Sequence, residues 1–350
     1  MSLIAVASII GQPFWGSYID KRGSVRNVLI GSFLVSAAVI LLIPHFASVF
    51  IVIIVIGITA SFTESSMQSI IDSWTISCTS EKPWIDYGLT RGMGSLGYAL
   101  TAVIFGLVID RFGFGQMFYV HFAMSFLTIG FCLLVGKSSK PSCQSAMTGV
   151  SKFSFPLLSI GKSPPFIWFL VSSTVIYIGF RALSTFYPLL LLQRGGDNKA
   201  LGLSLFIMAA SEVPVLFASR KLLARFKDTS LITISMFFFL IRILLHALIP
   251  SATGLIAIQM TQALSFGLFL PSSVHYIKRL APVGMSSTFL TIASSCYFGI
   301  GGILGSFLGG LIIDRSGIDF MLWCSVFSTL AGLMIFVAAP KNANRDRSVL

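Results

Sequence analysis

Eleven long runs of apolar residues divide this chain, and they constrain its fold more than any other feature. They lie near residues 3–19, 27–43, 49–72, 92–109, 114–135, 165–191, 200–218, 229–249, 254–277, 287–313 and 320–339. A helix needs about 20 apolar residues to cross the hydrocarbon core of a bilayer. A transmembrane β-barrel would instead show segments of about 10 residues with alternating polarity. Because these runs are continuously apolar, the sequence predicts an all-α polytopic membrane protein with eleven transmembrane helices.

The composition excludes the main soluble classes. Of the 350 residues, 55% are hydrophobic and only 10% are charged, whereas soluble domains carry about 25% charged residues. A folded chain in water could not cover itself with so few polar side chains. The sequence contains no phosphate-binding loop, no nucleophile elbow and no zinc pattern. The five cysteines form no CxxC pair. We therefore expect no enzyme activity, no cofactor, no metal site and no disulfide.

The net charge of +12 is distributed unevenly between the connections. Eighteen of the 24 Lys and Arg residues fall in one alternating set of connections and four fall in the other. Cytoplasmic loops carry such an excess of positive charge. The bias predicts a cytoplasmic C-terminus in a plasma membrane or cell inner membrane. It also explains the basic composition without a nucleic-acid partner and leaves the lipid bilayer as the surrounding medium.

An internal repeat indicates two homologous halves. Residues 106–113 (GLVIDRFG) recur as 310–317 (GLIIDRSG), and the same offset of 204 carries the basic turn at 20–26 onto 224–230. Repeats of this kind are typical of transporters. The predicted parts are an N-terminal bundle (1–135), a linker (136–164), a C-terminal bundle (165–339) and a cytoplasmic tail (340–350). The second half has six spans and the first has five, so the counterpart of 165–191 is expected to be missing from this chain.

Several motifs resemble the major facilitator superfamily. They are Gly16–Arg26 (GSYIDKRGSVR), Asp72-Ser-Trp74, Asp86–Gly97 (DYGLTRGMGSLG), Gln262–Gly267 (QALSFG) and the glycines from Gly301 to Gly310. The last four are similar to the group that holds phenylpropionate-permease-like and sugar- or nucleoside-proton-symporter-like members. The resemblance implies a major facilitator fold of two pseudo-symmetric bundles, in which the present spans are family helices 2–12. It also implies that Asp20, Arg22, Gly23 and Arg26 gate the conformational cycle, although Arg26 fits a purely topological role equally well.

Polar residues in the span 49–72 form a stripe. Glu64, Gln68 and Asp72 follow one another in steps of four and therefore share one helix face. An ionisable residue inside a membrane span costs about 2.5–3.5 kcal/mol on insertion scales, so it requires a reason. Glu64 is a candidate proton carrier, Gln68 and Asp72 would continue the pathway, and Asp72 could also form a gating pair with Arg91. The alternative is a structural hydrogen-bond stripe.

The second half holds a further set of candidates. Arg181 would contact substrate or a counter-ion, unless it extends its charge towards the membrane surface. Glu212 and Arg242 would form an ion pair on adjacent helices, used either in coupling or in static packing. Gln259 and Gln262, three residues apart, share a face and would bind a polar substrate or join helices.

These residues favour a secondary active transporter. The expected substrate is a small polar organic solute of the sugar, nucleoside or aromatic acid class, moved by alternating access with protons as the coupling ion. One alternative is a non-transporting facilitator-like membrane protein or a truncated inactive form. Within transport, the alternative is efflux of amphiphiles or drugs.

Overall fold

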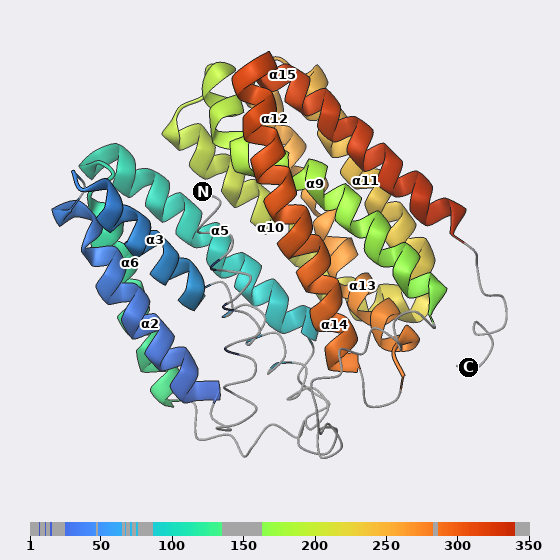
Figure 1. The fold of residues 1–350 in the computed structure, drawn as a ribbon, viewed down its shortest axis with the longest axis horizontal. Helices are drawn as coiled ribbons and strands as arrows, with labels where there is room; N and C mark the ends of the chain where they lie inside the picture. Colours follow the sequence, from blue (N-terminus) through green and yellow to red (C-terminus); the bar gives the residue numbers. More distant parts are fainter. Residues whose placement is uncertain are drawn as a thin grey trace. The chain divides into compact units, whose positions relative to one another are not determined.

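The computed structural model describes residues 25–46, 48–64, 87–134, 163–282 and 286–339, together with residues 7, 11, 15, 67, 71 and 75. All regular structure in these residues is helical (Figure 1). Eight described helices are long and apolar enough to cross a membrane, and Phe50–Glu64 is a shorter apolar helix. The expected all-α membrane fold is confirmed. The count of eleven spans stays a prediction, because most of 3–19 lies outside the described residues.

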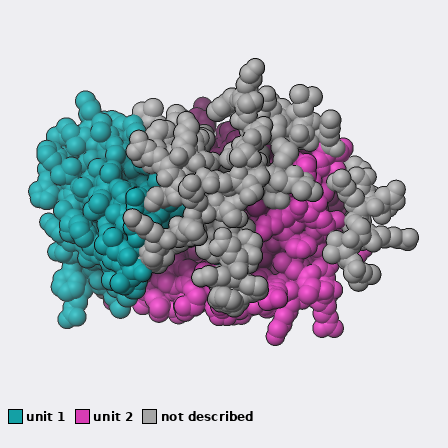
Figure 2. All heavy atoms as spheres, turned by 90° about the horizontal axis from the view of Figure 1, so that it is seen from below, with its two compact units in different colours: residues 1–87, 104–149 teal, residues 88–103, 150–350 magenta. Residues whose placement is uncertain are grey.

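The chain forms two compact units, shown in teal and magenta in Figure 2. Unit 1 comprises residues 1–87 and 104–149, and unit 2 comprises residues 88–103 and 150–350. Helix α5 (Tyr87–Phe112) is shared, because its residues 88–103 belong to unit 2. Contacts made by this part of α5 with residues after 150 are therefore contacts within unit 2.

Unit 1 is built on helix α2 (Val25–Leu41), which packs against α3 (Phe50–Glu64) and α6 (Gln116–Leu134). A short 3₁₀ helix η1 (Ile43–His45) follows α2. Its proline, Pro44, has no backbone N–H and cannot continue an α-helix without losing a hydrogen bond. Among the described helices of this unit, α2 contacts both α3 and α6.

Unit 2 contains the longer series of helices. Its elements after α5 are α9 (Pro164–Gln193), α10 (Asn198–Arg225), α11 (Asp228–Leu248), α12 (Ala252–Ile258), η2 (Gln259–Gln262), α13 (Phe266–Leu280), α14 (Ser286–Ser294), η3 (Ser295–Ile300) and α15 (Gly301–Ala338). Side chains fix two of the starts: Asp197 accepts a hydrogen bond from the Ala200 amide at 2.7 Å, and Ser251 accepts one from the Gly254 amide at 3.2 Å. Both are N-caps that satisfy otherwise unpaired amides.

Helix α15 is broken at Gly317, which has φ 84° and ψ 171°. The break falls between the predicted spans 287–313 and 320–339. In unit 1 the corresponding residue of the repeat, Gly113, follows α5 with φ 82°. A residue with a side chain rarely adopts this left-handed conformation. The repeat in sequence is thus also a repeat in backbone geometry, and its last glycine ends a helix in both units.

A ladder of glycines on the first arm of α15 lies against α9. Gly301, Gly305 and Gly309 face Thr174, Ile178 and Ala182, so the steps are four residues on both helices. A Cβ atom on Gly305 would lie 2.4 Å from the Ile178 carbonyl oxygen, and one on Gly301 would lie 3.0 Å from the Thr174 carbonyl oxygen. Small residues at a helix interface allow this close packing.

The glycines of α5 are arranged differently. A Cβ atom on Gly94 or Gly97 would meet nothing within 4 Å among the described residues. Gly92 makes the close approach instead, because a Cβ atom there would lie 2.4 Å from the Phe217 ring. Spacing alone predicts that glycines share a face, but it does not say which face meets a neighbour.

We predict that Gly305→Ala destabilises the protein. The added methyl would collide with backbone, which cannot rotate away as a side chain does, and such overpacking costs about 1–3 kcal/mol. The measurement is the midpoint of thermal unfolding of purified protein in detergent. Gly310→Ala is the matched control, because its Cβ atom would lie 3.4 Å from the end of the Phe186 ring. Equal midpoints for the two variants would contradict the close packing of α9 and α15.

Candidate functional site

A buried polar cluster in unit 2 gathers the candidates of the second half. Glu212 comes from α10, Arg242 and His246 from α11, and Gln259 and Gln262 from η2. All five side chains are buried. Around them lie apolar and aromatic residues of the unit 2 core. Charged and amide groups in such surroundings are costly unless they are hydrogen-bonded, so their partners determine the arrangement.

The two glutamines lie where the predicted span 254–277 is interrupted. Helix α12 ends at Ile258, the next turn is the 3₁₀ helix η2, and α13 begins at Phe266. Side chains three residues apart eclipse in a 3₁₀ helix, so Gln259 and Gln262 point the same way. This turn packs against both α10 and α11. The shared face predicted from the sequence is therefore present, in a tighter helix than expected.

Glu212 is held by two hydrogen bonds. Gln262 Nε2 donates to its Oε1 at 2.6 Å, and Ser95 Oγ of α5 donates to its Oε2 at 3.0 Å. The charges of Arg91 and Arg242 also act on this carboxylate. Arg91, expected as a gating residue, therefore lies in the electrostatic neighbourhood of Glu212. Its expected partner Asp72 lies outside the described residues.

Arg242 is bound to the other glutamine. Its Nη2 donates to Gln259 Oε1 at 2.6 Å, and its guanidinium carbon lies 5.5 Å from the centre of the Phe180 ring. Gln259 Nε2 lies 3.2 Å from His246 Nε2, while His246 Nδ1 lies 2.7 Å from the Arg242 carbonyl oxygen. A neutral imidazole with its proton on Nδ1 satisfies both contacts. His246 thus supports Gln259, which in turn orients Arg242.

The direct Glu212–Arg242 ion pair predicted from the sequence is not formed. Within unit 2 as described, neither side chain reaches the other within 4 Å, and each binds an amide of η2 instead. The reason is the position of η2, which places one glutamine at each charge. The two groups still interact electrostatically across this turn. The structure brings together the four residues that the sequence singled out, but they connect in a different order from the one expected.

Several buried polar atoms in and near this cluster make no hydrogen bond to the described residues. They are Arg242 Nε and Nη1, Gln262 Oε1 and the Tyr177 hydroxyl. Most buried polar groups in proteins are paired, so unpaired ones require an explanation. The two Arg242 donors and the Gln262 acceptor could together bind a solute that both accepts and donates hydrogen bonds.

A second cluster lies in unit 1. Ser36 of α2 donates to Glu64 Oε1 of α3, and the same hydroxyl lies 3.2 Å from His121 Nε2 of α6. His121 Nε2 is 3.6 Å from Glu64 Oε1. Sequence reasoning singled out Glu64 but missed His121 and Ser36. The signal was available, because His121 is an ionisable residue inside the apolar span 114–135.

Other candidates lie apart from these clusters or outside the described residues. Arg181 is exposed on α9, and its aliphatic stem lies against Gly302 and Gly305 of α15. It makes no hydrogen bond or ion pair with the described residues. Arg26 lies in the first turn of α2. Five predicted site residues fall outside the described residues: Asp20, Arg22, Gly23, Gln68 and Asp72.

The basic turn at 224–230 contains a contact that the sequence did not reveal. Asp228, the first residue of α11, is buried and accepts from Arg279 Nε and Nη2, both at 2.9 Å. His275 Nδ1 lies 3.3 Å from the same carboxylate. Both partners belong to the last turns of α13. This bidentate pair joins the start of α11 to the end of α13.

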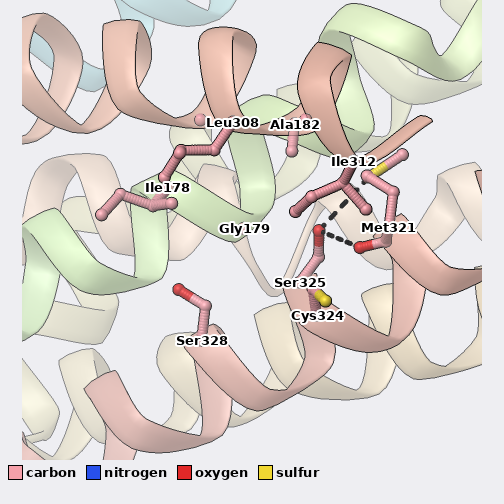
Figure 3. A pocket seen from close by; sticks show the side chains of 11 residues that line it. Ile178, Gly179, Ala182, Leu308, Ile312, Met321, Cys324, Ser325 and Ser328 are labelled. Atoms are coloured by element: carbon pink, nitrogen blue, oxygen red, sulfur yellow. Dashed lines mark hydrogen bonds between the residues drawn. The ribbon is translucent and has the colours of Figure 1, made fainter. Parts of the chain in front are cut away.

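One pocket of unit 2 lies between α9 and the two arms of α15 (Figure 3). Its volume is ≈ 250 Å³, and its lining is apolar apart from Cys324, Ser325 and Ser328. Ser325 and Ser328 donate to the backbone carbonyls of Met321 and Val175. No charged residue lines this pocket, so the candidate site for a polar solute remains the cluster around Glu212.

Comparisons with known proteins agree with the fold. Residues 1–323 match the family described as the MFS_1 like family. The chain is 25% identical over 341 residues to a maltose permease of Geobacillus stearothermophilus, covering 97% of this chain and 84% of the permease. It is 25% identical over 267 residues to the multidrug resistance protein MdtL of Shewanella oneidensis, covering 72% and 64% of the two chains.

The fold is also that of a solved transporter structure. The nucleoside transporter NupG superposes with a TM-score of 0.73 at 16% sequence identity, covering 97% of this chain and 88% of that chain. This likeness supports the major facilitator fold expected from the motifs. The family match and the eight apolar helices together identify the chain as a multi-pass membrane protein.

We predict that Asp228→Asn destabilises the protein by about 1–3 kcal/mol, because it removes the charge from a buried pair of hydrogen bonds. Asp319→Asn is the control: Asp319 pairs with Arg194 at 2.5 Å but is 67% exposed, and exposed pairs contribute about 1 kcal/mol or less. Thermal unfolding of both variants in detergent checks the difference. An Asp228→Asn protein as stable as Asp319→Asn would show that the pair does not hold α11 to α13.

Proposed function

Because the chain belongs to the MFS_1 like family, we propose that it moves a small polar organic solute across a membrane by alternating access, with protons as the coupling ion. The chain is a transporter of this family and not an enzyme. The observation that carries the proposal is the Glu212 cluster, in which buried polar atoms beside a carboxylate have no hydrogen-bond partner among the described residues.

The chemistry of this cluster suits a sugar, a nucleoside or an aromatic acid. Arg242 Nε and Nη1 would donate to hydroxyl, carbonyl or carboxylate oxygens, and Gln262 Oε1 would accept from a hydroxyl or N–H group. Aromatic rings lie beside them: the Tyr177 and Phe180 ring centres are 5.6 Å apart, and those of Phe180 and Phe239 are 5.0 Å apart. Such rings pack well against a base or the apolar face of a sugar. The maltose permease and the nucleoside transporter support the same solute classes by similarity.

Proton coupling would use two carboxyl groups, one buried in unit 2 and one partly exposed on unit 1. We assign Glu212 to the site in unit 2 and Glu64 to unit 1, with Gln68 and Asp72 continuing the pathway beyond Glu64. A proton that binds Glu212 would remove its charge and weaken its hydrogen bonds to Gln262 and Ser95. Since Gln262 and Gln259 share one turn, this change would reach Arg242, and solute binding and proton binding would be linked. Arg181 would contact the solute or a counter-ion from α9.

For the conformational cycle we keep the predicted organisation. The N-terminal bundle (1–135) and the C-terminal bundle (165–339) would rock about the solute, joined by the linker (136–164). Asp20, Arg22, Gly23, Arg26 and Arg91 would gate the cytoplasmic side. The excess of Lys and Arg supports a cytoplasmic location for that side and for the tail at 340–350.

Efflux of amphiphiles is the second candidate, and the similarity to the multidrug resistance protein supports it. Uptake into right-side-out and inverted vesicles separates the two. Import of radiolabelled maltose, uridine or phenylpropionate into right-side-out vesicles supports the first proposal. Accumulation of an amphiphilic dye in inverted vesicles, without uptake of the three solutes, supports efflux.

We predict that Glu212→Gln abolishes accumulation of the transported solute against its gradient in proteoliposomes with an imposed proton gradient. The amide keeps the shape of the side chain but cannot carry a proton. Exchange of solute between the two sides at equal pH should persist, because it needs no net proton movement. Asp319→Asn serves as the control and should accumulate solute as the unchanged protein does. Full accumulation by Glu212→Gln would remove Glu212 from the coupling mechanism.

A further inference from the structure

Three helices of unit 1 bring two titratable side chains to one buried hydroxyl. Ser36, on α2, is fully buried, and its Oγ contacts both Glu64 of α3 and His121 Nε2 of α6. The residues are 28 and 85 positions apart in the chain, so only the packing of the three helices joins them. Glu64 and His121 are both partly exposed on the unit 1 surface, which gives the cluster access to its surroundings.

The hydrogen bonds of this cluster all donate in one direction. A hydroxyl has one proton to donate and can accept from others. Ser36 donates its proton to the Glu64 carboxylate, so its oxygen must accept from His121, which therefore carries its proton on Nε2. Ser125 does not compete as a donor, because its hydroxyl donates to the His121 carbonyl oxygen at 2.8 Å. The chain of donors thus runs from His121 through Ser36 to Glu64.

No other charge in the described part of these helices offsets Glu64. The remaining titratable side chains of α2, α3 and α6 are Arg26, Tyr119 and Cys132, and none of them contacts Glu64 or His121 in the described structure. With His121 neutral the cluster carries one negative charge, and with one added proton it is neutral overall. A net charge inside a membrane is costly.

We propose that Glu64, Ser36 and His121 form a proton-binding site in unit 1, separate from the Glu212 cluster. The inference rests on the proposed function. A proton from water would bind His121 Nδ1, which makes no hydrogen bond to the described residues. The Nε2 proton would pass to Ser36 Oγ as the Ser36 proton passes to Glu64 Oε1. One proton is gained, His121 ends neutral with its proton on Nδ1, and Glu64 ends protonated.

The first test uses the full chain in proteoliposomes with maltose and uridine as probes. His121→Gln keeps a hydrogen-bonding side chain but cannot bind a proton. We expect it to lower proton-driven accumulation at least tenfold while solute exchange at equal pH stays within twofold. Thr128→Val is the control on the same helix, because the Thr128 hydroxyl only donates to the Met124 carbonyl oxygen. Accumulation by His121→Gln equal to that of the control would overturn the proposal.

The second test does not depend on transport. The chain has four histidines, so ¹⁵N-histidine labelling in nanodiscs gives a small set of imidazole signals, and His121→Gln identifies the one that belongs to His121. We expect this signal to change its pH response in Glu64→Gln and in Ser36→Ala, but not in Thr128→Val. An unchanged response in Glu64→Gln would overturn the shared site. If the unchanged protein accumulates neither probe while the signals remain coupled, the failure lies with the proposed function and not with this site.

Discussion

Inside a membrane a buried charge must find its partners within the protein, because no bulk water can supply them. Unit 2 meets this constraint with amides. Gln262 holds Glu212, Gln259 holds Arg242, and His246 holds Gln259 in turn. Both glutamines belong to the same 3₁₀ turn, so the break between α12 and α13 is fixed by the two charges it serves. The irregular turn and the charged residues therefore depend on each other.

This arrangement differs from a salt bridge in what it permits. In a direct pair of opposite charges the two groups bind each other, and few of their hydrogen-bonding atoms remain for a ligand. Here each charged group uses only part of its hydrogen-bonding capacity on an amide, and two Arg242 donors make no hydrogen bond within the described part of the chain. The aromatic rings around Tyr177 exclude water without competing for those donors. For the proposed transport site, amide bridges would keep the charged groups stable in the empty protein and still available to a solute.

The sequence predicted the features that depend on a local pattern of residues, such as the helices and the side chains that share a helix face. Continuous apolar runs located the described helices, and the repeat that predicted two related halves ends in both at a glycine of positive φ, Gly113 and Gly317. Gln259 and Gln262 were correctly placed on one face because their spacing fixes it. The rotation of one helix against another has no such local signal. This explains why the Glu212–Arg242 pair was expected to be direct. The partners of Asp228 and Ser36 depend on packing between distant segments, although His121 could have been noticed as an ionisable residue in an apolar span.

The corner at Gly317 has a mechanical consequence. A single left-handed residue joins the two arms of α15, and the first of these arms is fitted to α9 through its glycine ladder. A long flexible connection would let one arm tilt without moving the other, but a one-residue connection allows little independent movement. A tilt of the first arm along α9 would therefore move the second arm with it, so that the two helices would tilt together.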